Sequence, residues 1–189
     1  MHRIAERLLN LELLDLAALA RSAELPLLRD WSQVRLRKSG PSVLEHAQAA
    51  MDALLREPPP SRDVPIRPWW SAMPAAFIAA MFLHAGAAGP SRTSHAARSA
   101  QVARDALRGL GVPFTVREHA ATMIAHQRTP AGLAGGGPPP ESYMRLACVL
   151  DLRALYHVLK ADAGGTASQR LESFRARAEA AGVFGTPPR

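Results

Sequence analysis

The chain has 189 residues, of which 48% are apolar, 21% charged and only 5% aromatic. This length suits one well-cored domain, and the excess of alanine and leucine over β-branched and aromatic residues favours packed helices over sheet. The net charge of +7 comes mostly from scattered arginines, so it fits either dispersed surface charge or a phosphate-binding face. The single cysteine, Cys148, excludes an internal disulfide framework and favours the cytoplasm; a small buried side chain is expected there rather than a reactive thiol.

The N-terminal part of the chain repeats leucine at helical spacing, which predicts one helix or a helix pair over residues 2–21. Acidic residues interrupt the apolar positions, so the segment lacks the continuous apolar core of a signal peptide. Ser42 is the last residue of the stretch SGPS (39–42) and is expected to cap a helix whose apolar positions run from Val43 to Leu55.

A proline-rich segment, EPPPSRDVPIRPWW over residues 57–70, predicts a loop because proline lacks the amide donor that helices and strands need. Its Trp69 and Trp70 either close a core or stack on a partner such as a nucleic-acid base. The apolar helix expected at about 74–84 is shorter than a membrane span and contains a histidine, so it is predicted to be a buried core helix.

Further helices are expected along the second half of the chain. Thr93 or Ser94 should cap one that ends before Gly111, and another should cover about 114–127. The glycine- and proline-rich stretch TPAGLAGGGPPP, residues 129–140, is typical of a flexible surface loop.

The C-terminal part predicts a long helix over 141–163, stopped by Gly164 and Gly165, and an amphipathic helix within 168–183. The total of seven or eight helices, with no convincing strand and no internal repeat, predicts an all-α helical bundle.

Histidines are the chemically distinctive residues of the middle helices. Five of the seven fall at helix ends or on helix faces, and an aspartate, Asp162, ends a later helix; the five are His46, His84, His95, His119 and His126. Imidazole nitrogens and carboxylate oxygens are ligands for divalent metals, and a helical bundle can gather them into one pocket. Their spacing matches no compact metal motif, so each histidine could instead be a hydrogen-bonded core residue.

Five segments carry these residues, in the order SVLEHAQAAMDALL, AAMFLHAGAAG, RTSHAARSAQVARDALRGLGVP, VREHAATMIAHQRTP and RALYHVLKADAGG. Together they resemble the HD superfamily of metal-dependent phosphohydrolases, and most closely the HD domain behind tRNA nucleotidyltransferases and poly(A) polymerases. The resemblance covers about residues 40–166. It implies an N-terminal helical extension packed on the core over 1–40, an HD-like helical domain over 41–166, and a C-terminal helix and tail over 167–189.

The family binds one or two divalent metals through a histidine on the first helix, a His-Asp pair, further histidines and a distant aspartate. Matched by position, the resemblance implies metal ligands at His46, His84 and Asp162. It implies catalytic roles for His95 and His126, which would help to hold a phosphate. The expected cofactor is one divalent ion, which is Zn, Mn, Fe, Mg or Ni, or else none.

The chain departs from the family in the stretch HAGAA. Ala85 stands where the family has the metal-bridging aspartate, and Ala88 where it has a lysine. A methyl group supplies neither charge nor a shared oxygen, which disfavours a two-metal clamp. Either a mononuclear site with an open water position remains, or a relic pocket of hydrogen-bonded histidines. Asp63 and Glu118 are candidates to fill the vacancy, whereas His119 falls off the metal-facing position of this matching.

Two functions follow from these features. The first is a degenerate HD-domain phosphohydrolase-like protein that acts on or binds nucleotide or nucleic-acid phosphates, as a phosphomonoesterase or phosphodiesterase where catalysis survives. The second is a non-catalytic HD-fold binding or scaffold module for nucleic acid or a protein partner, and neither function involves a membrane. The loss of the aspartate favours weakened or lost catalysis, and metal content separates the two.

Overall fold

The structure is a computed structural model that describes residues 2–22, 24–57, 66–88, 94–135 and 138–185. Within these ranges the chain is helical, and the sole β-type contact is an isolated antiparallel bridge between Arg35 and Ser42. The all-α class predicted from composition is therefore confirmed. None of the described helices is long and apolar enough to cross a membrane.

The described residues form eleven α-helices and one short 3₁₀ helix, more than the seven or eight predicted. In chain order they are α1 (Arg3–Leu9), α2 (Leu16–Arg21), α3 (Leu27–Gln33), α4 (Val43–Leu55), α5 (Ile66–Phe82), η1 (Ala85–Ala88), α6 (His95–Gly109), α7 (Phe114–Ala125), α8 (Thr129–Gly135), α9 (Pro140–Ala147), α10 (Leu152–Asp162) and α11 (Gln169–Ala180).

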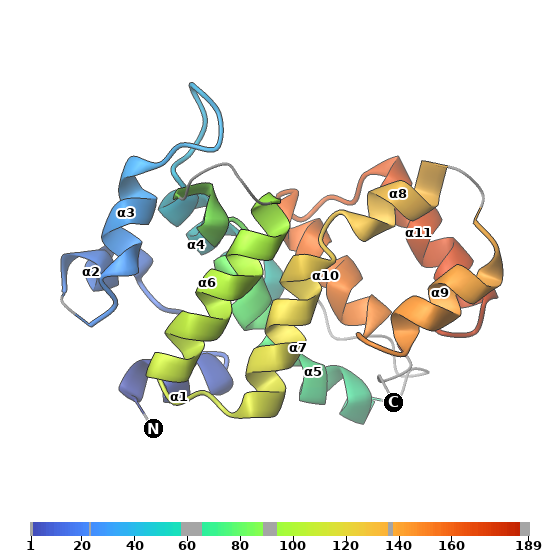
Figure 1. The fold of residues 1–189 in the computed structure, drawn as a ribbon, viewed down its shortest axis with the longest axis horizontal. Helices are drawn as coiled ribbons and strands as arrows, with labels where there is room; N and C mark the ends of the chain where they lie inside the picture. The colour runs from blue at the N-terminus through green and yellow to red at the C-terminus, as the bar shows by residue number, and fades with distance from the viewer. Residues whose placement is uncertain (1, 23, 58–65, 89–93, 136–137, 186–189) are drawn as a thin grey trace.

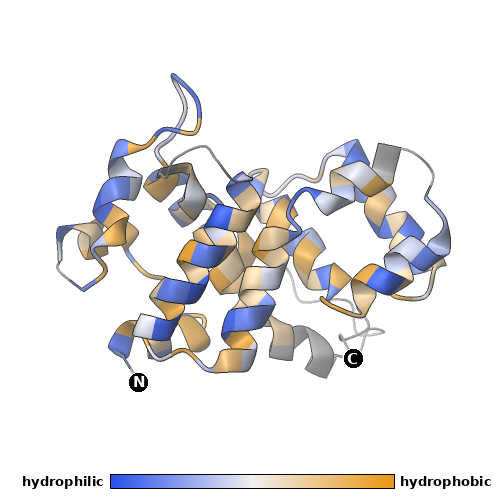
Figure 2. Ribbon diagram, viewed as in Figure 1, coloured by the Kyte–Doolittle hydropathy of each residue, from blue (hydrophilic) through white to orange (hydrophobic). Residues whose placement is uncertain are grey.

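Helix α5 is the centre of the bundle, packed against α4, α7 and α10, with α6 and α7 side by side in front of it in the view of Figure 1. Apolar residues line its inner length; Phe77 and Phe82 are fully buried. Surface helices such as α6 show mixed hydrophilic and hydrophobic residues (Figure 2), as expected for helices that place one face on the core. A continuous core of buried side chains runs from Ile4 to Ala178.

The N-terminal leucines form a helix pair, α1 and α2, one of the two arrangements predicted for residues 2–21. Helix α3 was not predicted from the sequence. It is anchored by Trp31, which is 1% exposed and meets the Phe82 ring edge-on at 5.3 Å between ring centroids. Between α3 and α4 the chain makes a projecting loop, visible at the top of Figure 1.

The predicted loop over 57–70 extends too far, because α5 begins at Ile66 and runs through Pro74 to Phe82. The prolines before it lie in residues 58–65, outside the described part of the chain, as do the side chains of the two tryptophans. The helix also ends two residues before His84, so this histidine lies in the turn after α5 and not on the helix.

The single long helix predicted over 141–163 is wrong, since the chain forms α9 and α10 with a break between them. The break is stabilised by Asp151, whose carboxylate accepts hydrogen bonds from the backbone N–H groups of Arg153 and Ala154 at 2.8 and 3.0 Å. Cys148 lies at the end of α9 and is exposed, which corrects the expectation of a buried side chain.

The predicted loop over 129–140 is also wrong in its first half, where α8 forms and packs against α11. Tertiary packing here outweighs the poor helix propensity of glycine. Helix α7 ends at Ala125, so His126 caps this helix instead of lying within it as predicted. The capping roles predicted for Ser42 and Ser94 are confirmed, and the amphipathic helix predicted within 168–183 is α11.

Candidate metal centre

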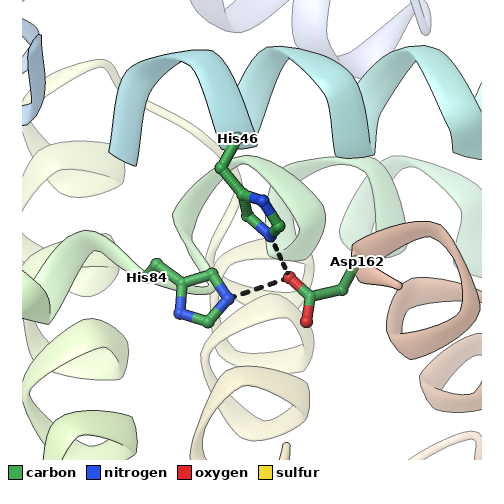
Figure 3. Close-up of side chains that lie close together, drawn as sticks. All are labelled: His46, His84 and Asp162. Atoms are coloured by element: carbon green, nitrogen blue, oxygen red, sulfur yellow. Dashed lines mark hydrogen bonds and ion pairs between the residues drawn. The ribbon is translucent and has the colours of Figure 1, made fainter. Parts of the chain in front are cut away.

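Three side chains from separate elements converge on one point at the edge of the bundle (Figure 3). The Nε2 atoms of His46 and His84 lie 2.8 and 2.9 Å from the same carboxylate oxygen, Oδ1 of Asp162. One ligand atom from each residue lies within 4.8 Å of the other two. All three side chains are half-buried, at 22 to 24% exposure, so a ligand can reach them from solvent.

Local structure explains how each member of this group reaches the site. His46 lies in the first turn of α4, where its N–H donates to the carbonyl of Ser42, the cap residue, at 3.0 Å. His84 is held in the turn after α5, where its carbonyl accepts from the N–H of Ala87 at 2.9 Å. Asp162 is the last residue of α10.

The carboxylate of Asp162 is strongly stabilised in its charged form. Burial alone would raise its pKa, but hydrogen bonds from His46 and His84, together with the charges of these imidazoles, lower the pKa to about 2. The group therefore offers a carboxylate oxygen and two imidazole nitrogens at neutral pH. This donor set fits the three-ligand arrangement that leaves a fourth position open in catalytic zinc sites.

A fourth imidazole, that of His95 at the start of α6, lies behind His84. Its Nε2 is 3.2 Å from Nδ1 of His84, so one of these two nitrogens must donate a proton to the other. Burial, then the positive charges of His84, Arg98 and Arg128, lower the pKa of His95 and favour its neutral form. A neutral His95 that accepts at Nε2 takes a hydrogen bond from Nδ1 of His84. Nε2 of His84, which donates to Asp162 here, is then the nitrogen that would bind an ion once it has lost its proton.

The structure does not bring the remaining histidines to this group. His126 meets Thr129, with 3.2 Å between its Nδ1 and the threonine Oγ1, and it does not line the pocket around the group. Its predicted catalytic role stays a prediction. His119 is exposed on α7, and His157 on α10 pairs with Glu57 at 3.1 Å.

The position that departs from the HD pattern is closed to solvent. Ala85 is 3% exposed in η1, and the next residue, Gly86, donates its N–H to Ser99 Oγ at 2.9 Å and accepts from Arg98 Nε at 3.0 Å. Glu118 does not fill the vacancy, because Arg104 and Arg117 bind its carboxylate at 2.8 and 3.3 Å. The other candidate, at position 63, lies outside the described residues.

A pocket of about 710 Å³ opens over the group. Among the described residues that line it, Asp162 is the one carboxylate, while Arg37 and Arg128 contribute positive charge and Gln127 a polar amide. Sequence reasoning missed these three residues. Arg37 belongs to a short basic stretch, RLRK over residues 35–38, but nothing in that stretch indicates the direction of its side chain.

Comparisons with known proteins give no further identification, since no family model, curated protein or solved structure matches the chain. The resemblance to the HD superfamily therefore stays a prediction from the sequence. What the structure adds is the grouping of two imidazoles and one carboxylate from distant parts of the chain.

Proposed function

We propose that the chain is an HD-type phosphohydrolase-like protein with a mononuclear metal centre, which acts on or binds nucleotide or nucleic-acid phosphates. The observation that carries this proposal is the convergence of His46, His84 and Asp162 within ligand distance of one another. The residues are supplied by three different elements, and the donor set suits a borderline divalent ion such as Zn, Mn or Fe.

When bound there, a divalent ion would activate water and polarise a phosphoryl oxygen. The chain's own residues would then hold the substrate and fix the ligands. His95 orients the imidazole of His84 through the contact between their ring nitrogens, and the pocket's basic side chains attract an anionic group. Ala85 offers no oxygen to a second ion, so the proposal is limited to one metal.

A non-catalytic binding module is the second candidate, and the buried Ala85 favours it. The shared aspartate of the two-metal arrangement is missing, and Asp162 already accepts from both imidazoles, as it would in a hydrogen-bonded relic of such a site. In this case the arginine surface would bind nucleic acid with an affinity that falls steeply as salt is added.

Metal analysis separates the two candidates. Purified protein reconstituted with Zn, Mn or Fe should hold about one ion per chain, and the variants His46→Ala and His84→Ala should each lose it. His119→Ala is the matched control, because this histidine is exposed and lies away from the group. No metal on the reconstituted wild-type chain would refute the mononuclear centre and favour the binding module.

Restoring the missing acid tests whether the site has decayed from a working one. The Ala85→Asp variant should bind metal more tightly, or hydrolyse a phosphoester faster, than the wild-type chain. Ala97→Asp, at an exposed position on α6 that does not line the pocket, is the control for added negative charge. Equal metal affinity and activity in both variants would refute the matching of Ala85 to the family's bridging position.

A further inference from the structure

The loop between α3 and α4 is a built hairpin, which we name the Arg37 hairpin (residues 35–42). Backbone hydrogen bonds close it at its base, from Val43 to the Val34 carbonyl at 2.8 Å, and near its tip, from Gly40 to the Arg37 carbonyl at 3.1 Å. The guanidinium of Arg35 donates to the Gly40 carbonyl at 2.9 Å. The hairpin ends at the cap of α4, one turn before His46, so its position is fixed relative to the candidate metal centre.

The two arginines of this hairpin have different surroundings. Arg35 is committed to the hairpin's own backbone, whereas Arg37 lines the pocket over the metal group. Within the described residues, Arg37 is exposed and makes no side-chain hydrogen bond or ion pair. A long cationic side chain held beside a pocket without a protein partner is available to an anionic ligand.

Arg128 lines the same pocket from another segment, the turn between α7 and α8. The preceding residue, Gln127, fixes this turn by donating from its Nε2 to the carbonyls of Leu83 and Ile124 at 3.2 and 3.0 Å. Arg128 lies near enough to His95 for its charge to help lower the pKa of that imidazole. It too makes no side-chain hydrogen bond or ion pair within the described part of the chain.

The charges lining the pocket are unbalanced in favour of an anion. The pocket is flanked by two arginines that have no side-chain partner among the described residues. Its one described carboxylate, Asp162, is already engaged by both imidazoles of the metal group. Guanidinium groups bind phosphate through paired N–H donors, and two of them match the charge of a phosphomonoester dianion better than the single charge of an internal diester. A volume of about 710 Å³ suits a ligand of mononucleotide size.

We propose that Arg37 and Arg128 form a phosphate-binding subsite beside the His46, His84 and Asp162 group, and that this subsite takes the terminal phosphate of a phosphomonoester. The inference rests on the proposed function and narrows it, because it selects terminal phosphates over internal diesters. Arg37 lies within the N-terminal extension, so it would give this chain a substrate-binding residue outside the segment that resembles the HD superfamily.

Calorimetric titration with inorganic phosphate tests the subsite on chelator-treated, metal-free protein. The wild-type chain should bind phosphate, and Arg37→Gln and Arg128→Gln should each weaken binding by about tenfold. Arg37→Lys should give an intermediate loss, because it keeps the charge but not the paired donors. The matched control is Arg145→Gln, which removes the same charge from an exposed position on α9 outside the pocket and should leave binding unchanged.

Two results would overturn the subsite. One is the absence of phosphate binding to the metal-free wild-type chain, and the other is equal weakening in Arg145→Gln and the two pocket variants. Metal content is measured on the same preparations after reconstitution with the ion, so that loss of the metal centre is distinguished from loss of the subsite. A chain that holds metal but shows either result refutes this inference alone; a chain that binds phosphate through both arginines but holds no metal refutes the metal centre alone.

A competition experiment tests the preference for a terminal phosphate. An end-phosphorylated oligonucleotide and a nucleoside monophosphate should both displace inorganic phosphate, whereas the same oligonucleotide without its terminal phosphate should compete much less well. Equal displacement by the two oligonucleotides would refute the assignment to phosphomonoesters.

Discussion

Two pockets flank helix α4, and they differ in almost every property. The pocket over the metal group receives His46 from α4 and is lined by Arg37 and Arg128. The other, a groove of about 610 Å³, receives Leu44, Glu45, Gln48, Ala49 and Asp52 from the same helix, together with the leucines that precede and begin α2. One pocket is basic and polar, while the other is apolar with acidic side chains.

The difference lies in whether the charged groups already have partners. In the groove, Asp15 caps α2 by accepting from the Ala18 N–H at 2.8 Å, and Asp52 accepts from Gln48 at 3.1 Å. Glu45 accepts from the N–H and hydroxyl of Ser42 at 2.7 and 2.9 Å. These carboxylates are used to build the fold. The two arginines of the other pocket have no such use within the described residues, and we therefore assign ligand binding to that pocket and not to the groove.

The largest expected effect comes from adding a side chain at Gly86, in η1, which follows the candidate metal ligand His84. A Cβ atom at this position would lie 2.6 Å from the Ser99 backbone nitrogen and 2.8 Å from the His95 carbonyl oxygen. Backbone atoms cannot move aside cheaply, so Gly86→Ala should lower the free energy of unfolding by about 2 kcal/mol or more. Metal affinity should fall as well, because η1 and the start of α6 are pushed apart.

Gly109→Ala is the control for this substitution. An added Cβ at this glycine, the last residue of α6, would meet no atom of another segment within 4 Å. The substitution should therefore raise stability by about 0.5 kcal/mol without changing metal affinity. Urea unfolding and metal titration measure both quantities. If Gly86→Ala were as stable as the wild-type chain, the close packing of η1 on α6 would be wrong.

Local signals account for the parts of the fold that the sequence predicted well. Ser42 and Ser94 are residues that favour helix caps, and both cap helices in the structure. The break before α10 has a local signal too, the cap residue Asp151, but the leucine spacing continues across it and predicts one long helix. Helix α8 is rich in glycine, so local propensity disfavours it. It is stabilised by packing against α11, whose residues are distant in the sequence.

The candidate site also has residues that were expected before the structure and residues that were not. Nothing in the spacing of His46, His84 and Asp162 predicts that they meet, and their grouping was expected only from the resemblance to the HD superfamily. Arg37 lies outside the segments that carry this resemblance, and Arg128, although within one of them, was matched to no site position. Their convergence depends on the hairpin before α4 and the turn after α7, two irregular segments whose direction no hydrophobic period predicts.

The next expected effect concerns His95, a polar residue of the metal pocket that, unlike the two arginines, already has a protein partner. Replacing it by leucine removes the acceptor for the Nδ1 proton of His84, so His84 can take the wrong tautomer and metal affinity should fall by about 10- to 100-fold. His95→Gln keeps an acceptor oxygen and should lose less. Competition titration with a metal chelator measures the affinities.

Nuclear magnetic resonance of the imidazole nitrogens gives a readout that a purely structural role would not affect. In the metal-loaded wild-type chain, where the ion occupies Nε2 of His84, the Nδ1 proton should show the chemical shift of a hydrogen-bonded N–H, and this shift should be lost in His95→Leu. Wild-type metal affinity in His95→Leu, with an unchanged Nδ1 signal of His84, would show that His95 does not position this ligand.

The smallest expected effect comes from Ser42, which lines neither pocket but bonds to segments that line each of them. Its hydroxyl accepts from the Glu45 N–H at 3.2 Å on the groove side, and its backbone ends the Arg37 hairpin on the other. Ser42→Ala should cost about 1 kcal/mol of stability, the usual value of a lost helix cap.

Ser168→Ala is the matched control. The hydroxyl of Ser168 caps α11 by accepting from the Leu171 N–H at 3.3 Å, so its loss should cost about as much stability. The two variants should differ in phosphate binding, which falls only in Ser42→Ala because only this cap holds the hairpin and the first turn of α4 together. Equal phosphate affinity in the two variants would mean that the hairpin keeps its position without the cap, and that the two sides of α4 are independent.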